Sequence, residues 1–257
     1  MPASDLALPP VARALRDDAR LIVEAAHEAG RIALSFFGRN PNTWMKDGRS
    51  PVSEADLAAD RHLSTVLSAA RPTYGWLSEE TKDTDDRLSR ERVFIVDPID
   101  GTRGYLAGSD EWVVSVGLVE QGRPILGVLY RPVTGETYVA SRGGGAWRDG
   151  VRLSGPASTT GPHRFAGPKK LTSGRALEAL DLDRKPFVPS LALRLARIAT
   201  GELDATIAGG QAHDWDLAAA DLLVHEAGAL LTTVGGQGLV YNGASTRHPP
   251  LACPAVP

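Results

Sequence analysis

The strongest constraint on the fold comes from ten consecutive residues, Val-Phe-Ile-Val-Asp-Pro-Ile-Asp-Gly-Thr at positions 93–102. The four apolar residues that open this run favour a strand buried on both faces of a sheet. The strand delivers the carboxylates of Asp97 and Asp100 to its end, where the proline and the glycine favour a tight turn. Thr102 then stands where a helix can begin.

Two interpretations of this turn are open from the residues alone. Asp, Pro and Gly all favour turns, so the segment read by itself fits a solvated loop. The buried strand before it favours a ligand site, because open sheets usually bind ligands at the carboxyl ends of their strands. Carboxylates beside backbone N–H groups can hold hard cations and, through them, a phosphate. We therefore take residues 97–102 as a candidate metal and phosphate site.

Composition narrows the class of protein. The chain has 257 residues, enough for one large domain or two small ones, and a formal net charge of −3. This balance indicates neither a nucleic-acid polymer nor a membrane surface as partner. Cys253 is the single cysteine, so an internal disulfide is excluded and a reducing compartment fits. The N-terminal ten residues do not resemble a secretory signal, and charged residues interrupt the apolar stretch 217–231. We expect a cytoplasmic protein without a membrane span.

Periodicity and turn residues give a coarse order of elements. Helices are expected at 11–37, 53–70, 191–200 and 215–227. Strands are expected at 75–78, 93–96, 113–120, 124–130, 136–140, 205–207 and 229–234, with 113–140 as an antiparallel meander. The remaining segments are expected to be a loop or short hairpin at 40–53, a solvated, mobile loop at 82–92, a turn at 143–145 and a hinge at 154–172. Such a mixture predicts layered sheets and helices.

The run Asp97–Thr102 resembles the signature of the inositol monophosphatase family, which comprises magnesium-dependent, lithium-sensitive phosphomonoesterases. Other segments match that family in the same order along the chain: Ser53–Asp56, Trp76–Glu80, Ala140–Trp147, Trp215–Ala220 and Asn242-Gly243. Ser78 replaces the family's usual glycine. The resemblance implies an α+β fold, the αβαβα sandwich of the sugar phosphatases. It also implies a single domain, residues 1–257, whose halves (about 1–153 and 173–257) are joined by a Gly/Pro/Ser/Thr-rich segment.

The resemblance also implies a set of magnesium ligands. Glu79, Asp97 and the backbone carbonyl of Ile99 would hold the first Mg²⁺. Asp97, Asp100 and Asp216 would hold the second, so that Asp97 bridges the two ions. A third, weaker Mg²⁺ is implied at Glu79, held largely through water. Carboxylates that converge in this way are tolerable when cations neutralise them.

The catalytic roles follow from the same resemblance. One metal ion would activate a water molecule and the other would stabilise the leaving oxygen. Thr102 would orient or deprotonate the water, with Asp56 behind it as proton acceptor and Glu79 as a further catalytic carboxylate. The backbone N–H groups of Gly101 and Thr102 would face the phosphate, so no covalent enzyme intermediate is needed.

Each of these residues also has a purely structural interpretation. Asp56 and Asp216 can each cap a helix, and Glu79-Glu80 can be ordinary surface charge. The joint presence of all of them with the Asp97–Thr102 turn favours the functional interpretation. Structural roles are expected for the three histidines His27, His213 and His225.

The substrate is less constrained than the chemistry. Inositol monophosphatases carry an acidic sugar-binding residue where this chain has Gly209, and they usually continue Gly-Thr with Thr-Asn-Phe rather than Arg103-Gly104-Tyr105. A basic residue after Thr102 resembles the 3′(2′),5′-bisphosphate nucleotidase branch, although Gly104 departs from that branch too. The expected substrate is therefore adenosine 3′,5′-bisphosphate, a small phosphorylated molecule.

A second phosphate requires a cationic partner. The candidates are Arg194, Lys169 and Lys170, and the lysine pair also fits ordinary solvated surface. The full set of expected substrate contacts is Gly101, Thr102, Asp100, Asp216, Arg194, Lys169 and Lys170. Two alternatives stay open: a phosphatase for a polyol or amino-alcohol phosphate such as inositol or histidinol phosphate, and a binding protein without turnover. A monomer and a homodimer are equally compatible with the sequence.

Overall fold

A seven-stranded sheet forms the centre of the structure. The computed structural model describes residues 8–46, 50–156, 161–172 and 181–254. The strand order of the sheet is β3-β4-β5-β6-β7-β8-β9. Its strands are β3 (Gly75–Ser78), β4 (Arg92–Asp100), β5 (Val113–Glu120), β6 (Arg123–Arg131), β7 (Glu136–Ser141), β8 (Gly145–Arg148) and β9 (Val151–Arg152). Strand β3 runs parallel to β4, and each later strand pairs antiparallel with the one before it. The predicted meander, and the predicted turn at 143–145, are confirmed.

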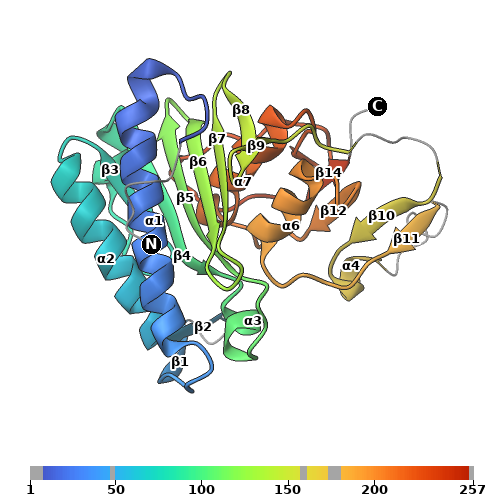
Figure 1. Ribbon diagram of the computed structural model, residues 1–257, viewed down its shortest axis with the longest axis horizontal. Coiled ribbons are helices and arrows are strands. Elements are labelled where there is room, and N and C mark those ends of the chain that lie inside the picture. The colour runs from blue at the N-terminus through green and yellow to red at the C-terminus, as the bar shows by residue number, and fades with distance from the viewer. Residues whose placement is uncertain (1–7, 47–49, 157–160, 173–180, 255–257) are drawn as a thin grey trace.

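Helices cover both faces of this sheet (Figure 1). On one face lie α1 (Arg16–Phe36), which follows the short 3-10 helix η2 (Arg13–Leu15), and α2 (Glu54–Ala70). On the other face lies α7 (Asp214–Glu226). A Cβ atom at Gly127 would lie 2.5 Å from the carbonyl oxygen of Ala219, so a glycine in β6 lets α7 approach the sheet backbone.

A second, five-stranded sheet follows beyond α7 and α6 (Leu191–Ala199), as Figure 1 shows. Its strand order is β11-β10-β12-β14-β13. The strands are β10 (His163–Ala166), β11 (Leu182–Arg184), β12 (Ala205–Ala208), β13 (Thr232–Thr233) and β14 (Leu251–Pro254), and α4 (Lys169–Thr172) follows β10. The order helices, sheet, helices, sheet agrees with the expected α+β sandwich. None of the described helices has the length and apolar character needed to cross a bilayer.

Two short elements frame the end of β4. Residues 40–53 contain the hairpin β1 (Thr43–Lys46) and β2 (Ser50–Ser53), which leads directly into α2. The five-residue helix α3 (Thr102–Leu106) begins where Thr102 was expected to open a helix. Both elements therefore stand beside the carboxylates that β4 delivers.

The solvated, mobile loop predicted for residues 82–92 is wrong in part. Residues 85–89 form the 3-10 helix η3 (Asp85–Ser89), and the side chain of Arg87 within it is only 1% exposed. Its guanidinium donates to both oxygens of Asp83 at 2.7 and 2.8 Å and to Oδ1 of Asn242 at 2.7 Å. A buried charge is tolerated when it is paired and hydrogen-bonded in this way. The burial of Arg87 could not be predicted from composition, because its partner Asn242 is distant in sequence.

Two further predictions need correction, and one strand was missed. The hinge predicted for 154–172 contains β10 and α4, because β10 pairs with β11 and β12 inside the second sheet. Of the strand predicted for 229–234, only β13 is present in the structure. Strand β14 was not predicted. We keep the division into two halves, about 1–153 and 173–257, as a proposal.

Candidate active site

The strand predicted for 93–96 continues as β4 to Asp100, so Asp97 and Asp100 lie at its carboxyl end rather than in a turn after it. Asp97 is 1% exposed, and its Oδ1 accepts a hydrogen bond from the backbone N–H of Ile99 at 2.9 Å. The pairing of β4 with β5 shifts register between Asp97, which pairs with Ser115, and Asp100, which pairs with Val113. Gly101 has φ of 104°, a left-handed conformation that favours glycine.

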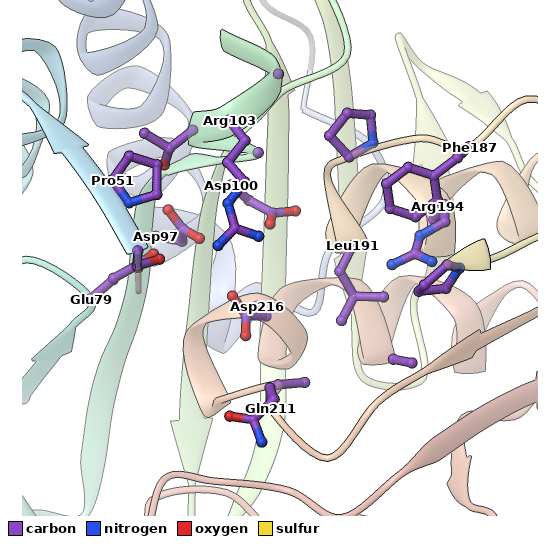
Figure 2. Close-up of a pocket in the computed structure, with 18 of the residues that line it drawn as sticks. Pro51, Glu79, Asp97, Asp100, Arg103, Phe187, Leu191, Arg194, Gln211 and Asp216 are labelled. Carbon is purple, nitrogen blue, oxygen red and sulfur yellow. The ribbon is translucent and has the colours of Figure 1, made fainter. Parts of the chain in front are cut away.

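Three carboxylates from different elements meet at this turn. Oxygen atoms of Glu79, Asp97 and Asp216 all lie within 4.8 Å of one another. Glu79 follows β3, Asp97 lies in β4 and Asp216 lies in the first turn of α7. Together with Asp100 they line a cavity of about 550 Å³, into which Figure 2 shows these side chains converging.

Helix N-termini hold the site carboxylates in place. Asp216 is the third residue of α7, and its Oδ2 accepts from the backbone N–H of His213 at 2.7 Å. Asp100 Oδ2 accepts from the hydroxyl of Ser190 at 2.5 Å and from the N–H of Ala192 at 2.6 Å, at the start of α6. These bonds satisfy N–H groups that have no partner within a helix, and the helix dipole favours a negative charge there.

The expected pair of Thr102 and Asp56 is present in the structure. The hydroxyl of Thr102 lies 3.2 Å from Oδ1 of Asp56 and 3.1 Å from the carbonyl oxygen of Ile99. The other oxygen of Asp56 accepts from the N–H and the hydroxyl of Ser53 at 2.8 and 2.6 Å, as in a capping box. Asp56 therefore caps α2 and also faces Thr102, so its structural and functional interpretations are compatible.

Burial makes the charged forms of these carboxylates costly. It raises the pKa of Asp97 and of Asp216 well above the usual value, and the neighbouring carboxylates raise them further. The pKa of Glu79 rises to about 7 for the same two reasons. A cation among these oxygens would reverse both effects. All of these donors are the hard oxygen ligands that Mg²⁺ prefers, so the cluster is suited to divalent metal ions.

The raised pKa values predict how pH affects the metal-free protein. Between about pH 4.5 and pH 7 the unfolded chain releases protons that the folded cluster retains, so the free energy of unfolding falls as pH rises. We expect the Tm in a chelator to drop by about 5 °C from pH 5 to pH 8, and saturating Mg²⁺ to remove the drop. Thermal unfolding across that range measures both. A flat metal-free profile would contradict the electrostatics of the cluster.

The three cations predicted to bind a second phosphate differ in their position relative to the cavity. Arg194 on α6 lines the cavity and is 4% exposed, and Figure 2 shows it next to Phe187. Lys169 is exposed on α4 and is not among the residues that line the cavity, although its neighbour Pro168 is. The side chain of Lys170 lies outside the described part of the structure.

Sequence reasoning missed three residues around the site. Ser190 holds Asp100, Phe187 lies at the cavity wall, and Lys46 donates to the carbonyl oxygen of Glu79 and to Glu80. Ser190 had a readable signal, because serine before an amphipathic run favours an N-cap. Phe187 and Lys46 had none, since both reach the site through the tertiary fold.

The structure is thus a layered α+β sandwich, with carboxylates suited to divalent metal ions gathered at the end of a central strand, beside a Thr-Asp pair. Comparison with known proteins makes the assignment specific: the chain belongs to the inositol monophosphatase family, whose model matches residues 15–250. The members of this family hydrolyse phosphate monoesters, so this protein is a phosphatase.

Individual relatives carry different names. An inositol-1-monophosphatase of Mesorhizobium japonicum is 34% identical over 247 residues, covering 87% of this chain and 88% of the relative. The 3′(2′),5′-bisphosphate nucleotidase CysQ of Aggregatibacter actinomycetemcomitans is 29% identical over 231 residues, covering 86% of each chain. The crystal structure of the extragenic suppressor protein suhB from Bartonella henselae superposes with a TM-score of 0.82, at 30% identity and 93% coverage of both chains. The expected sandwich fold is thereby confirmed.

Proposed function

We propose that this phosphatase is a 3′(2′),5′-bisphosphate nucleotidase, which removes the 3′-phosphate from adenosine 3′,5′-bisphosphate to give AMP and phosphate. The observation that carries the proposal is the guanidinium of Arg194 in the cavity wall. Its Nη1 donates to the carbonyl oxygen of Ile207 at 3.3 Å, and its buried Nε has no hydrogen-bond partner among the described residues. Burial lowers the pKa of Arg194 to about 10. The carboxylate of Asp100 interacts favourably with this guanidinium and opposes the effect of burial. An anionic substrate group in this part of the cavity would add a partner for the unpaired Nε.

The neighbouring surface suits a nucleoside. The ring of Phe187 is 44% exposed and lies 5.0 Å from the guanidinium carbon of Arg194. Pro189 and Leu191 extend the apolar wall of the same cavity. Aromatic and apolar side chains bind the face of a base by stacking, while a guanidinium binds its phosphate.

A polyol phosphatase is the alternative, and the name and higher identity of the Mesorhizobium relative favour it. One position in the cavity wall argues against a polyol phosphatase. Gly209 lines the cavity where, by the resemblance, inositol monophosphatases carry an acidic side chain for sugar hydroxyls. Gly209 offers no side chain to bind those hydroxyls.

The hydrolysis itself uses the cluster at the end of β4. We assign two Mg²⁺ ions to Glu79, Asp97, the carbonyl of Ile99, Asp100 and Asp216, with a third, weaker ion at Glu79 and with inhibition by lithium. When bound, such ions lower the pKa of a water molecule and stabilise the leaving oxygen.

The proton moves along the Thr102–Asp56 pair in this proposal. Thr102 accepts a proton from the attacking water as its own hydroxyl proton passes to Asp56, which lies 3.2 Å away. Burial raises the pKa of Asp56, which improves it as a proton acceptor. The backbone N–H groups of Gly101 and Thr102 bind the phosphate oxygens while the leaving group is displaced from phosphorus. We further propose a cytoplasmic enzyme, a monomer or homodimer, in keeping with its single, free cysteine.

Replacement of Arg194 by alanine tests the substrate. We expect KM for adenosine 3′,5′-bisphosphate to rise at least about tenfold, since a charge-assisted hydrogen bond contributes roughly 1.5–3 kcal/mol. KM for inositol 1-phosphate, which has one phosphate, should stay unchanged and serves as the internal control for folding. Steady-state phosphate release gives both values.

Three further variants complete this experiment. Lys169→Ala and Lys170→Ala test the other candidates for the second phosphate, and Arg194→Lys keeps the charge without the forked donor. If all three alanine variants keep the KM of the wild type for the bisphosphate, the nucleotidase assignment is wrong.

A further inference from the structure

We propose that Arg103 is a catalytic residue, whose guanidinium contacts the phosphoryl group during its transfer and balances its negative charge. The inference rests on the metal-dependent hydrolysis proposed above, but not on the choice of substrate. Arg103 is the residue that follows Thr102, and it is where the chain departs from the Thr-Asn-Phe continuation of inositol monophosphatases. The departure places an extra cation directly beside the reacting groups.

Arg103 lies where two cavities meet. It lines the cavity of about 550 Å³ that contains Arg194 and a second, more polar one of about 910 Å³. Both cavities also include Glu79 and Asp216. In Figure 2 the side chain of Arg103 projects from α3 into the space between Asp97, Asp100 and Asp216. A phosphate bound over the carboxylate cluster would therefore lie within reach of this guanidinium.

The packing of α3 sets the position of Arg103. A Cβ atom at Gly104 would lie 3.1 and 3.2 Å from the ring of Pro189, so the glycine lets α3 pack closely on the segment that leads to Ser190. Tyr105 holds the other side of α3 through a hydrogen bond of 2.8 Å to the carbonyl oxygen of Ala33. The unusual pair Arg103-Gly104 thus has a joint explanation: the glycine fixes the short helix that presents the arginine.

Two other cations, Lys46 and Arg247, line the more polar of these cavities. Lys46 is bound to the carbonyl oxygen of Glu79 and pairs with the carboxylate of Glu80 at 3.2 Å. Arg247 donates from Nε to the carbonyl oxygen of Gly210 at 3.0 Å. The Arg103 side chain is exposed to the cavity, where its planar fork of donors can bind two phosphate oxygens at once.

The chemistry needs a donor in this position. As water attacks, a new P–O bond forms, the ester P–O bond breaks, and the leaving oxygen takes up a proton. Negative charge spreads over the three oxygens that stay on phosphorus, and fixed positive groups aimed at them supply much of the catalysis. Arg103 takes no part in the proton transfer and only donates hydrogen bonds.

Arg103→Thr, which introduces the residue usual in inositol monophosphatases, tests the proposal. We expect kcat to fall about 100-fold, the typical loss for one such donor, and to fall equally for adenosine 3′,5′-bisphosphate and inositol 1-phosphate. Calorimetry should show inorganic phosphate binding the Mg²⁺-loaded enzyme about tenfold more weakly. Mg²⁺ itself should bind as tightly or more tightly, because a cation beside the carboxylates has been removed.

Two companions sharpen the test. Arg103→Lys keeps the charge and should recover part of the lost kcat. Arg20→Thr removes the same charge from an exposed position on α1 and should leave all three measurements unchanged.

Three results would overturn the role of Arg103. The first is a kcat of Arg103→Thr within about threefold of the wild type. The second is a parallel loss of affinity for Mg²⁺ and phosphate, which indicates a structural role. The third is a loss confined to the bisphosphate, which indicates that Arg103 recognises the second phosphate. Since the expected losses are equal for both substrates, they do not depend on which substrate the wild type prefers.

Discussion

Asparagine in place of Asp97 is expected to lower Mg²⁺-dependent phosphate release at least about 1,000-fold, equivalent to roughly 4 kcal/mol of transition-state stabilisation. Asp97 is the most enclosed member of the carboxylate cluster, with Glu79 and Asp216 within 4.8 Å of it. Asparagine has nearly the same shape but neither the charge nor the second anionic oxygen that a bridging ligand needs. Phosphate assays measure the loss of activity, and calorimetric titration with Mg²⁺ measures the loss of metal affinity.

The same variant should be more stable than the wild type when metal is absent. Burial and like charges oppose ionisation of Asp97, so a neutral side chain relieves the folded state at neutral pH. A higher Tm in a chelator, with Mg²⁺ no longer raising it, separates loss of a ligand from misfolding. Asp17→Asn on the exposed face of α1 is the matched control. Retained activity in Asp97→Asn would exclude the metal assignment. Asp100→Asn should also abolish release with the fold intact, though Asp100 additionally holds the start of α6.

Removal of the hydroxyl in Thr102→Ala is expected to lower kcat by a factor of about 100 to 1,000, within the range for loss of a positioned proton-transfer group. KM should change little, because the backbone N–H groups that would bind phosphate are retained. Thr102→Ser keeps the hydroxyl and should retain most of the activity. Steady-state kinetics on the Mg²⁺-saturated enzymes gives both constants.

A double-mutant cycle with Asp56 tests whether the pair acts as a unit. If Asp56 accepts the proton through Thr102, then Asp56→Asn combined with Thr102→Ala should be about as slow as the slower single variant. Because Asp56 also caps α2, the Tm of each variant must be compared. Strictly additive losses, or Thr102→Ala at the wild-type kcat, would contradict the proton path.

Local sequence signals explain why much of the site was predictable. Asp97, Asp100 and Thr102 lie within six consecutive residues, so the sequence predicts their proximity. Asp56 and Asp216 could be placed because an acidic side chain three residues after an N-cap reaches back to it. The hydrogen bonds from Ser53 and His213 show this arrangement in both helices.

The features that sequence reasoning missed depend on contacts between distant segments. Arg87 is buried by its bond to Asn242, and Asp100 is held by Ser190, although each pair is separated by many residues. Strand β14 was missed because a few residues near the end of the chain carry little periodicity, and pairing with β12 defines it. The contacts of Lys46 with Glu79 and Glu80 could not be predicted from sequence, because they join residues that meet only in the folded structure.

The most direct test is phosphate release by the wild-type enzyme, with Mg²⁺ and in a chelator, from a panel of four substrates. The panel comprises adenosine 3′,5′-bisphosphate, inositol 1-phosphate, histidinol phosphate and fructose 1,6-bisphosphate, each also assayed with added lithium. We expect release only with Mg²⁺, inhibition by lithium, and the highest kcat/KM for adenosine 3′,5′-bisphosphate. Equal release in the chelator would contradict the metal site, and a higher kcat/KM for inositol 1-phosphate or histidinol phosphate would replace the nucleotidase with a polyol or amino-alcohol phosphatase.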